Sequence, residues 1–157
     1  MLKIEIWNEN TILRTVSSII YTIELNTYIK LGREMIKYIK NPDNIWVWLA
    51  APQIWYNKRL IVVSLLKDRE DKKFSTIMMI NPEIIEKSKE MYIENEWCLS
   101  VPWKKWPVER YTSLKIQFIN ENKKNQTLIL QGISARIVQH EIDHLDGILF
   151  IDKIVKK

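Results

Sequence analysis

The chain has 157 residues, of which 46% are hydrophobic and 27% charged, and its formal net charge is +5. These values predict one globular domain, spanning residues 1–157, with one sizeable core. No apolar run approaches the roughly 18 residues of a membrane span, and residues 1–5 lack the apolar stretch of a secretory signal, so we expect a cytoplasmic protein with no membrane contact. A single cysteine, Cys98, excludes an internal disulfide.

The first expected element is an N-terminal helix over residues 19–40, which would cover the core. Apolar residues recur in it at helical spacing, at Ile23, Leu31, Met35 and Ile39. Asn41 and Pro42 would end the helix.

The middle of the chain is typical of β-strands. The stretches 59–66 and 74–80 are apolar, and we expect Asn81 and Pro82 to stop the second one. The run of charged residues at 67–73 between them would form an exposed loop or hairpin tip.

Two more strands and a second helix follow. Residues 108–119 alternate between apolar and polar, as a half-buried strand does, and 127–130 would form a short strand before Gly132. From Ile133 to Leu145 the pattern becomes helical. We therefore predict an α+β fold in which mostly antiparallel sheets pack around a central C-terminal helix, with the N-terminal helix beside them.

The second helix contains the chain's only two histidines, in the pattern His-Glu-x-x-His. Residues four apart share one face of a helix, so His140 and His144 can bind one ion while Glu141 moves protons for an attacking water. Two unrelated surface histidines would be the alternative. The combination of residue types and spacing favours a metal-dependent hydrolase.

Two histidines leave a catalytic ion short of a third protein ligand. The candidates are Cys98, Glu96 and Asp143. Asp143 is next to His144 in the sequence and is better suited to orient a ligand imidazole than to bind the ion. A lone buried cysteine is more often a core residue than a ligand. Here the histidine pair reverses that preference, and we favour Cys98.

The segment Leu49–Gln53 combines small residues with an amide side chain. Small residues let a substrate approach the backbone, and Gln53 can donate an N–H to a developing oxyanion. On its own, the segment fits a plain turn better.

Together the three segments resemble the motifs of peptide deformylases, which are Gly-x-Gly-x-Ala-Ala-x-Gln, Glu-Gly-Cys-Leu-Ser and Gln-His-Glu-x-Asp-His. Here they read Trp-Val-Trp-Leu-Ala-Ala-Pro-Gln at 46–53, Glu-Trp-Cys-Leu-Ser at 96–100 and Gln-His-Glu-Ile-Asp-His at 139–144. Their order and spacing match across nearly the whole chain.

The resemblance implies removal of the formyl group from the N-terminal formyl-methionine of nascent polypeptides. It implies one divalent metal ion, usually Fe²⁺ in the cell and often Zn²⁺ or Ni²⁺ in purified protein, held by Cys98, His140 and His144. Glu141 would be the general acid and base. Gln53 and the backbone N–H of Leu99 would stabilise the oxyanion.

The resemblance also places the substrate. It implies that the methionine pocket and peptide groove are formed by Val47, Trp48, Trp97, Ile133 and Ile137. The backbone of residues 46–48 and 97–99 would bind the peptide.

The charge of the chain bears on its partners. The lysines are scattered among acidic residues, so we expect a solvated surface, no specific nucleic-acid binding and a monomer. The positive charge favours weak association with the anionic ribosome. The basic group at the chain end is small, consisting of Lys153, Lys156 and Lys157, so we do not expect specific docking there.

Two other functions stay open. A metalloprotease of the His-Glu-x-x-His type would explain the helix, although not Cys98 or Gln53. An inactive, deformylase-like protein that binds peptides would be consistent with tryptophan in the groove.

Tryptophan stands where the family has, or commonly has, glycine. The positions account for all seven tryptophans of the chain: Trp7, Trp46, Trp48, Trp55, Trp97, Trp103 and Trp106. The seven tryptophans and three glycines together make up about 6% of the chain, close to the usual glycine share of about 7%. We hypothesise that these codons are UGA, written here as tryptophan but translated as glycine in the source organism.

We therefore expect UGA at all seven tryptophan codons when the gene is sequenced. The physical reason is that glycine serves positions with positive φ or close backbone approach, where an indole would clash or fill the substrate groove. UGG codons at these positions would contradict the hypothesis.

Overall fold

The structure is a computed structural model that describes residues 2–6, 10–43, 48–66 and 74–155. Its helices and strands are α1 (Leu25–Lys40), β1 (Trp48–Ala50), β2 (Leu60–Leu65), β3 (Ser75–Lys87), β4 (Met91–Cys98), β5 (Val101–Tyr111), β6 (Ser113–Ile119), β7 (Asn125–Gln131) and α2 (Gly132–Leu145). Short 3₁₀ helices lie at Thr11–Arg14, Thr22–Glu24, Ala51–Ile54 and Phe150–Lys153.

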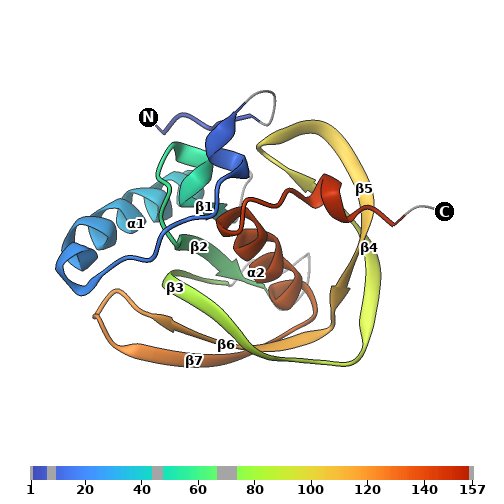
Figure 1. The fold of residues 1–157 in the computed structure, drawn as a ribbon. Coiled ribbons are helices and arrows are strands. Elements are labelled where there is room, and N and C mark those ends of the chain that lie inside the picture. Colours follow the sequence, from blue (N-terminus) through green and yellow to red (C-terminus); the bar gives the residue numbers. More distant parts are fainter. Residues whose placement is uncertain (1, 7–9, 44–47, 67–73, 156–157) are drawn as a thin grey trace.

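The strands form two antiparallel groups. One sheet has the order β1-β2-β3-β6-β7, and β4 and β5 form a separate hairpin. Figure 1 shows α2 at the centre, with α1 on one side and the β4–β5 hairpin on the other. Helix α2 contacts strands of both groups, including β1, β2, β5 and β7. The predicted α+β architecture, with a central C-terminal helix and an N-terminal helix, is confirmed.

Strand β2 separates two parts of the core. Ile61 and Val63 pack on one face with side chains of α2, and Leu60 and Val62 pack on the other face with side chains of α1. Successive side chains of a strand point to opposite faces, so a strand covered by a helix on each side is apolar throughout. This is why the sequence around β2 is a continuous apolar run.

Helix α2 is buried although it is rich in polar residues. Every residue from Ser134 to Leu145 is buried. The apolar ones pack against the sheet, and the polar ones are Ser134, Arg136, Gln139, His140, Glu141, Asp143 and His144. Burying polar groups is unfavourable unless each finds a partner, so this helix marks the region where a functional site is expected.

The turn after α2 requires a glycine. Gly147 has a φ of 71°, and a Cβ at that position would lie 2.8 Å from the backbone of Arg14. Nearby, Arg59 donates to the carboxylate of Asp146 at 2.7 Å. The first contact places the turn against the N-terminal segment, and the second ties it to the start of β2.

Some predicted element boundaries are wrong. The helix expected at 19–40 starts at Leu25, after a short 3₁₀ turn. The side chain of Asn81 accepts a hydrogen bond from the N–H of Ile20 and donates one to its C=O, both at 2.8 Å. These two bonds hold Ile20 outside the helix. The strand expected to stop at Asn81 and Pro82 continues as β3 to Lys87. A register shift between Ile80 and Glu83 and a φ of 50° at Asn81 accommodate this pair within the strand.

The strand expected over 108–119 is two strands of different sheets. Strands β5 and β6 meet at Thr112, whose N–H donates to the carbonyl of Glu90 at 3.0 Å, and this contact turns the chain from the hairpin into the larger sheet. The short strand before Gly132 and the second helix are confirmed as β7 and α2. The charged run at 67–73 lies outside the described residues. None of the described helices is long and apolar enough to cross a membrane.

Two of the described tryptophans have a left-handed backbone. Trp55 has a φ of 70° and Trp103 a φ of 66°. A side chain with a Cβ costs roughly 1–2 kcal/mol in this conformation, and glycine costs little. The backbone at both positions is therefore the one that glycine prefers.

We expect Trp103→Gly to raise the free energy of unfolding by about 0.5–1 kcal/mol, because it relieves the left-handed conformation at a modest entropic cost. The Trp103 side chain is 99% exposed, so its removal sacrifices little packing. Urea denaturation checks this.

Two matched variants control the experiment. Trp103→Ala keeps the backbone strain and should gain nothing. Trp106→Gly should destabilise the protein, because the Trp106 ring packs 6.5 Å from that of Phe150. Equal gains from Trp103→Ala and Trp103→Gly would rule out the backbone as the cause.

Candidate metal centre

Helix α2 and the end of β4 bring three metal-ligand side chains together. His140 and His144 lie one turn apart on α2, with ring centroids 5.0 Å apart. Cys98 is the last residue of β4, and its Sγ lies 3.2 Å from Nε2 of His144. One donor atom from each of the three residues lies within 4.8 Å of the others. Such a cluster of buried thiol and imidazole groups has the composition of a transition-metal site.

Several buried atoms at this cluster lack a hydrogen-bond partner within the described chain. They are Nε2 of His140, Nδ1 of His144 and both carboxylate oxygens of Glu141. Unpaired buried polar atoms are costly and rare in native proteins. A divalent ion beside His140 and a water beside Glu141 would satisfy most of them, so the residues present fit the metal.

Burial favours the neutral forms of the donor groups in this cluster. Burial raises the pKa of the Cys98 thiol, and the nearby Glu141 adds to this rise. Burial lowers the pKa of His144 well below its usual value, which keeps its imidazole neutral, as a ligand must be. A metal ion is what favours the thiolate over the thiol in such surroundings.

Glu141 is fully buried beside the cluster, with Oε1 3.9 Å from Nε2 of His140. Burial raises the pKa of Glu141 well above its usual value, and the negative charge of Glu96 raises it further. A carboxyl group whose pKa is moved toward neutrality can both accept and deliver a proton.

Glu96 supports the cluster from behind. Its carboxylate accepts hydrogen bonds from Nε and Nη2 of Arg110 at 2.9 and 2.8 Å and from Nη1 of Arg136 at 2.6 Å, and it lies 3.0 Å from Nδ1 of His140. Burial by itself would raise the pKa of Glu96, but the hydrogen bonds from Arg110 and His140 outweigh it and hold that pKa well below its usual value. An ionised carboxylate on Nδ1 leaves Nε2 of His140 to face the ion.

The prediction that Asp143 orients a ligand imidazole is wrong. Asp143 instead binds Nη1 of Arg110 and accepts from Nζ of Lys153 at 2.7 Å. Adjacent helix residues point in different directions, so an aspartate beside a histidine in sequence does not face its ring. Both alternative third ligands, Glu96 and Asp143, are engaged in ion pairs in the structure.

Sequence reasoning missed Arg110 and Arg136. Both guanidinium groups are buried, and their partners are at least 14 residues away along the chain. Nothing in the local sequence distinguishes them from surface arginines.

Gln53 lies in the 3₁₀ helix Ala51–Ile54 and points toward the cluster. Its Oε1 accepts from the N–H of Ala50 at 2.8 Å, which directs Nε2 toward the site. Nε2 lies 3.1 Å from Oγ of Ser100 and 3.5 Å from Sγ of Cys98. Leu99 follows Cys98 directly, in the turn between β4 and β5. The structure thus brings Gln53 and Leu99 to the three residues that could hold a metal ion.

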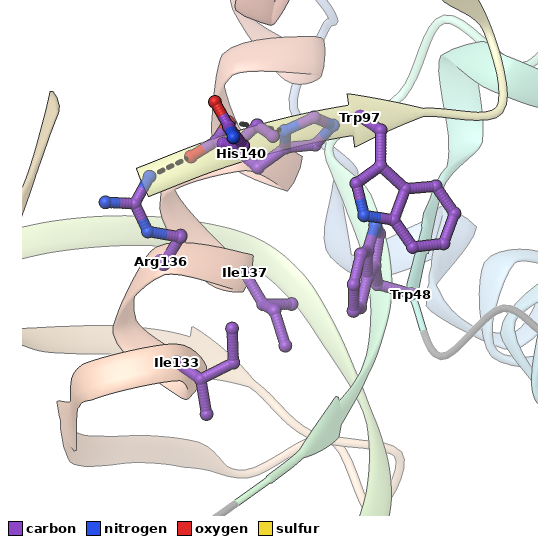
Figure 2. A pocket seen from close by; sticks show the side chains of 8 residues that line it. Trp48, Trp97, Ile133, Arg136, Ile137 and His140 are labelled. Carbon is purple, nitrogen blue, oxygen red and sulfur yellow. Dashed lines mark hydrogen bonds and ion pairs between the residues drawn. The ribbon is translucent and has the colours of Figure 1, made fainter. Parts of the chain in front are cut away.

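A pocket opens beside His140. Four of the predicted substrate residues line it, as Figure 2 shows. They are Trp48 from β1, Trp97 from β4, and Ile133 and Ile137 from α2. The pocket is mostly apolar next to the cluster, as a site for a hydrophobic side chain would be. The fifth predicted substrate residue, Val47, lies outside the described residues.

Comparisons with known proteins agree with this geometry. The family model described as polypeptide deformylase matches residues 1–157. The peptide deformylase of Rhizobium meliloti is 36% identical over 145 residues, which make up 92% of this chain and 80% of that protein. The peptide deformylase of Synechocystis is 36% identical over 125 residues, which make up 80% of this chain. The same residues match only 65% of the Synechocystis protein, so this chain spans just under two thirds of the length of that relative.

Solved structures share the fold over nearly the full chain. A class I type b peptide deformylase from Acinetobacter baumannii, with Met-Ala-Ser bound, is 35% identical with a TM-score of 0.87, covering 98% of each chain. The peptide deformylase from Thermotoga maritima is 31% identical with a TM-score of 0.84, covering 99% of each.

The chain belongs to the peptide deformylase family. Membership accounts for all three motifs at once and identifies a metal-dependent hydrolase of protein biosynthesis. The metalloprotease and the non-enzymatic alternative are not favoured, because relatives and structural neighbours alike are deformylases.

We expect Glu96→Gln to weaken metal binding about 10- to 100-fold, because an amide orients the imidazole of His140 less strongly than a carboxylate does. Competition with a coloured chelator measures the affinity. Glu86→Gln, on an exposed residue paired with Lys115, is the matched control and should leave it unchanged. Undiminished affinity in a Glu96→Gln protein with native circular dichroism would contradict the role of this carboxylate.

Proposed function

We propose that this chain removes the formyl group from the N-terminal formyl-methionine of nascent polypeptides, in the cytoplasm. The observation that carries the proposal is the meeting of Cys98, His140 and His144 within 4.8 Å, beside an apolar pocket and next to Gln53. Family membership supports it. So does the Acinetobacter baumannii relative with Met-Ala-Ser bound, since that tripeptide begins with methionine.

One divalent ion would be held by Cys98, His140 and His144, with Fe²⁺ as the native metal and Zn²⁺ or Ni²⁺ as substitutes in purified protein. When bound, the ion supplies Lewis acidity, which makes water a nucleophile near neutral pH and polarises the formyl carbonyl. Glu96 keeps the His140 ring in the orientation that this binding needs.

The chain's own residues then carry the reaction. As water attacks the formyl carbon, Glu141 accepts its proton. The N–H groups of Gln53 and of the Leu99 backbone stabilise the negative charge that develops on the formyl oxygen. Glu141 delivers the proton to the leaving nitrogen as the C–N bond breaks, which releases formate and a free N-terminal amine.

The substrate's first side chain would enter the pocket formed by Val47, Ile133 and Ile137. Trp48 and Trp97 also line it, and their backbone would bind the peptide. We further propose that the chain acts as a monomer whose association with the ribosome is weak.

The test measures formate release from formyl-Met-Ala-Ser by two metal-loaded proteins. One has tryptophan at all seven positions, and the other has glycine at all seven. We expect formate from at least the glycine form, and no cleavage of internal peptide bonds. If neither form releases formate although both are folded and metal-loaded, the proposal fails. Cleavage of internal bonds would favour the metalloprotease.

In whichever form is active, Glu141→Gln should lower kcat about 10²–10⁴-fold, because proton transfer is lost.

Gln53→Leu should lower kcat about 10²–10³-fold, because one oxyanion donor is lost. Metal content should stay near that of the parent in both variants. Glu86→Gln, on an exposed residue that pairs with Lys115 and is not part of the cluster, should be unaffected. Full activity in Glu141→Gln would exclude it as the proton carrier.

A further inference from the structure

The pocket beside His140 is too small for its proposed occupant. Its cavity volume is about 20 Å³. One water needs about 10–15 Å³, whereas ligand pockets commonly reach about 300 Å³ or more. The side chain of methionine therefore does not fit into the pocket as it stands.

Two indoles account for the lack of space. Trp48 comes from β1 and Trp97 from β4, and their rings meet edge to face with centroids 6.2 Å apart and an interplanar angle of 61°. Figure 2 shows the two rings together, beside Ile137, on the side of the pocket away from Arg136. Edge-to-face contact is a favourable arrangement of aromatic rings, so the pair holds this position.

The two indoles are separate from the metal cluster. Neither is a metal ligand, and the pocket reaches the cluster through His140. Both side chains are partly buried and line the cavity, and Trp48 also packs against the core beside α2. Their removal should therefore open space next to the reacting groups without removing a group that performs the chemistry.

We infer that Trp48 and Trp97 close the peptide groove between β1 and β4, and that glycine at both positions opens it to a methionine side chain. The inference rests on the proposed function, because it concerns the substrate of the same site. It makes positions 48 and 97 the determinants of whether a formyl-methionyl peptide is admitted. The left-handed backbone at Trp55 and Trp103 shows independently that other tryptophans of this chain also occupy glycine-like positions.

The test measures peptide binding by calorimetry with Zn²⁺-loaded protein and the tripeptide Met-Ala-Ser. The variant is Trp48→Gly/Trp97→Gly, and we expect it to bind at least tenfold more tightly than the parent. The gain should be smaller for Gly-Ala-Ser, which has no side chain to place in the pocket. Trp55→Gly is the matched control, since Trp55 is exposed and does not line the pocket. It should bind like the parent.

Circular dichroism and zinc content establish that each variant is folded and loaded. If a folded, zinc-loaded double variant binds Met-Ala-Ser no more tightly than the parent does, the inference is overturned. An equal gain in Trp55→Gly would also overturn it, because the effect would not be specific to the groove.

Formate release from formyl-Met-Ala-Ser separates this inference from the proposed function. If the double variant binds the tripeptide tightly but neither protein releases formate, the groove inference stands and the proposed function fails. If the parent releases formate with the same KM as the double variant, the proposed function stands and the groove inference fails.

Discussion

The carboxylate of Glu96 is the constraint on which the site depends. It lies on β4 and joins three elements, because it accepts from Arg110 on β5 and from Arg136 on α2, and it contacts His140 on α2. These contacts tie the β4–β5 hairpin to the central helix. Cys98, two residues further along β4, is thereby held 3.2 Å from His144. A buried charge that lost these partners would be strongly destabilising, so the network also fixes the distance between the hairpin and the helix.

Helix α2 buries both apolar side chains, which stabilise the core, and polar side chains, whose burial is unfavourable without partners. Its apolar side chains build the core against the sheet, whereas its polar side chains are buried at the cluster. Arg136 and Asp143 resolve part of this conflict through ion pairs inside the chain. Both carboxylate oxygens of Glu141, Nε2 of His140 and Nδ1 of His144 have no hydrogen-bond partner within the described residues, and a metal ion and a bound water would satisfy most of them. Such local violations of ordinary burial rules are characteristic of functional sites.

The tryptophans of this chain have different structural roles. Trp55 and Trp103 have the left-handed backbone of glycine, and Trp48 and Trp97 crowd the pocket. Trp106 differs from these four tryptophans, because its ring packs against Phe150 and its backbone φ is not positive. The structure therefore gives a physical reason for glycine at four of the five described positions, and the fifth rests on the family resemblance alone. Trp7 and Trp46 lie outside the described residues.

The sequence by itself determined the local features. The spacing of His140 and His144 places both rings on one helix face, and the apolar run at 59–66 predicts a strand, because such patterns depend only on local periodicity and residue type. Only the tertiary structure decided that Glu96 supports His140 while Asp143 does not, that β5 and β6 part at Thr112, and that two indoles meet in the groove. Those outcomes depend on the pairing of buried groups brought together from distant parts of the chain, and no local pattern encodes which partner a buried charge or ring will meet.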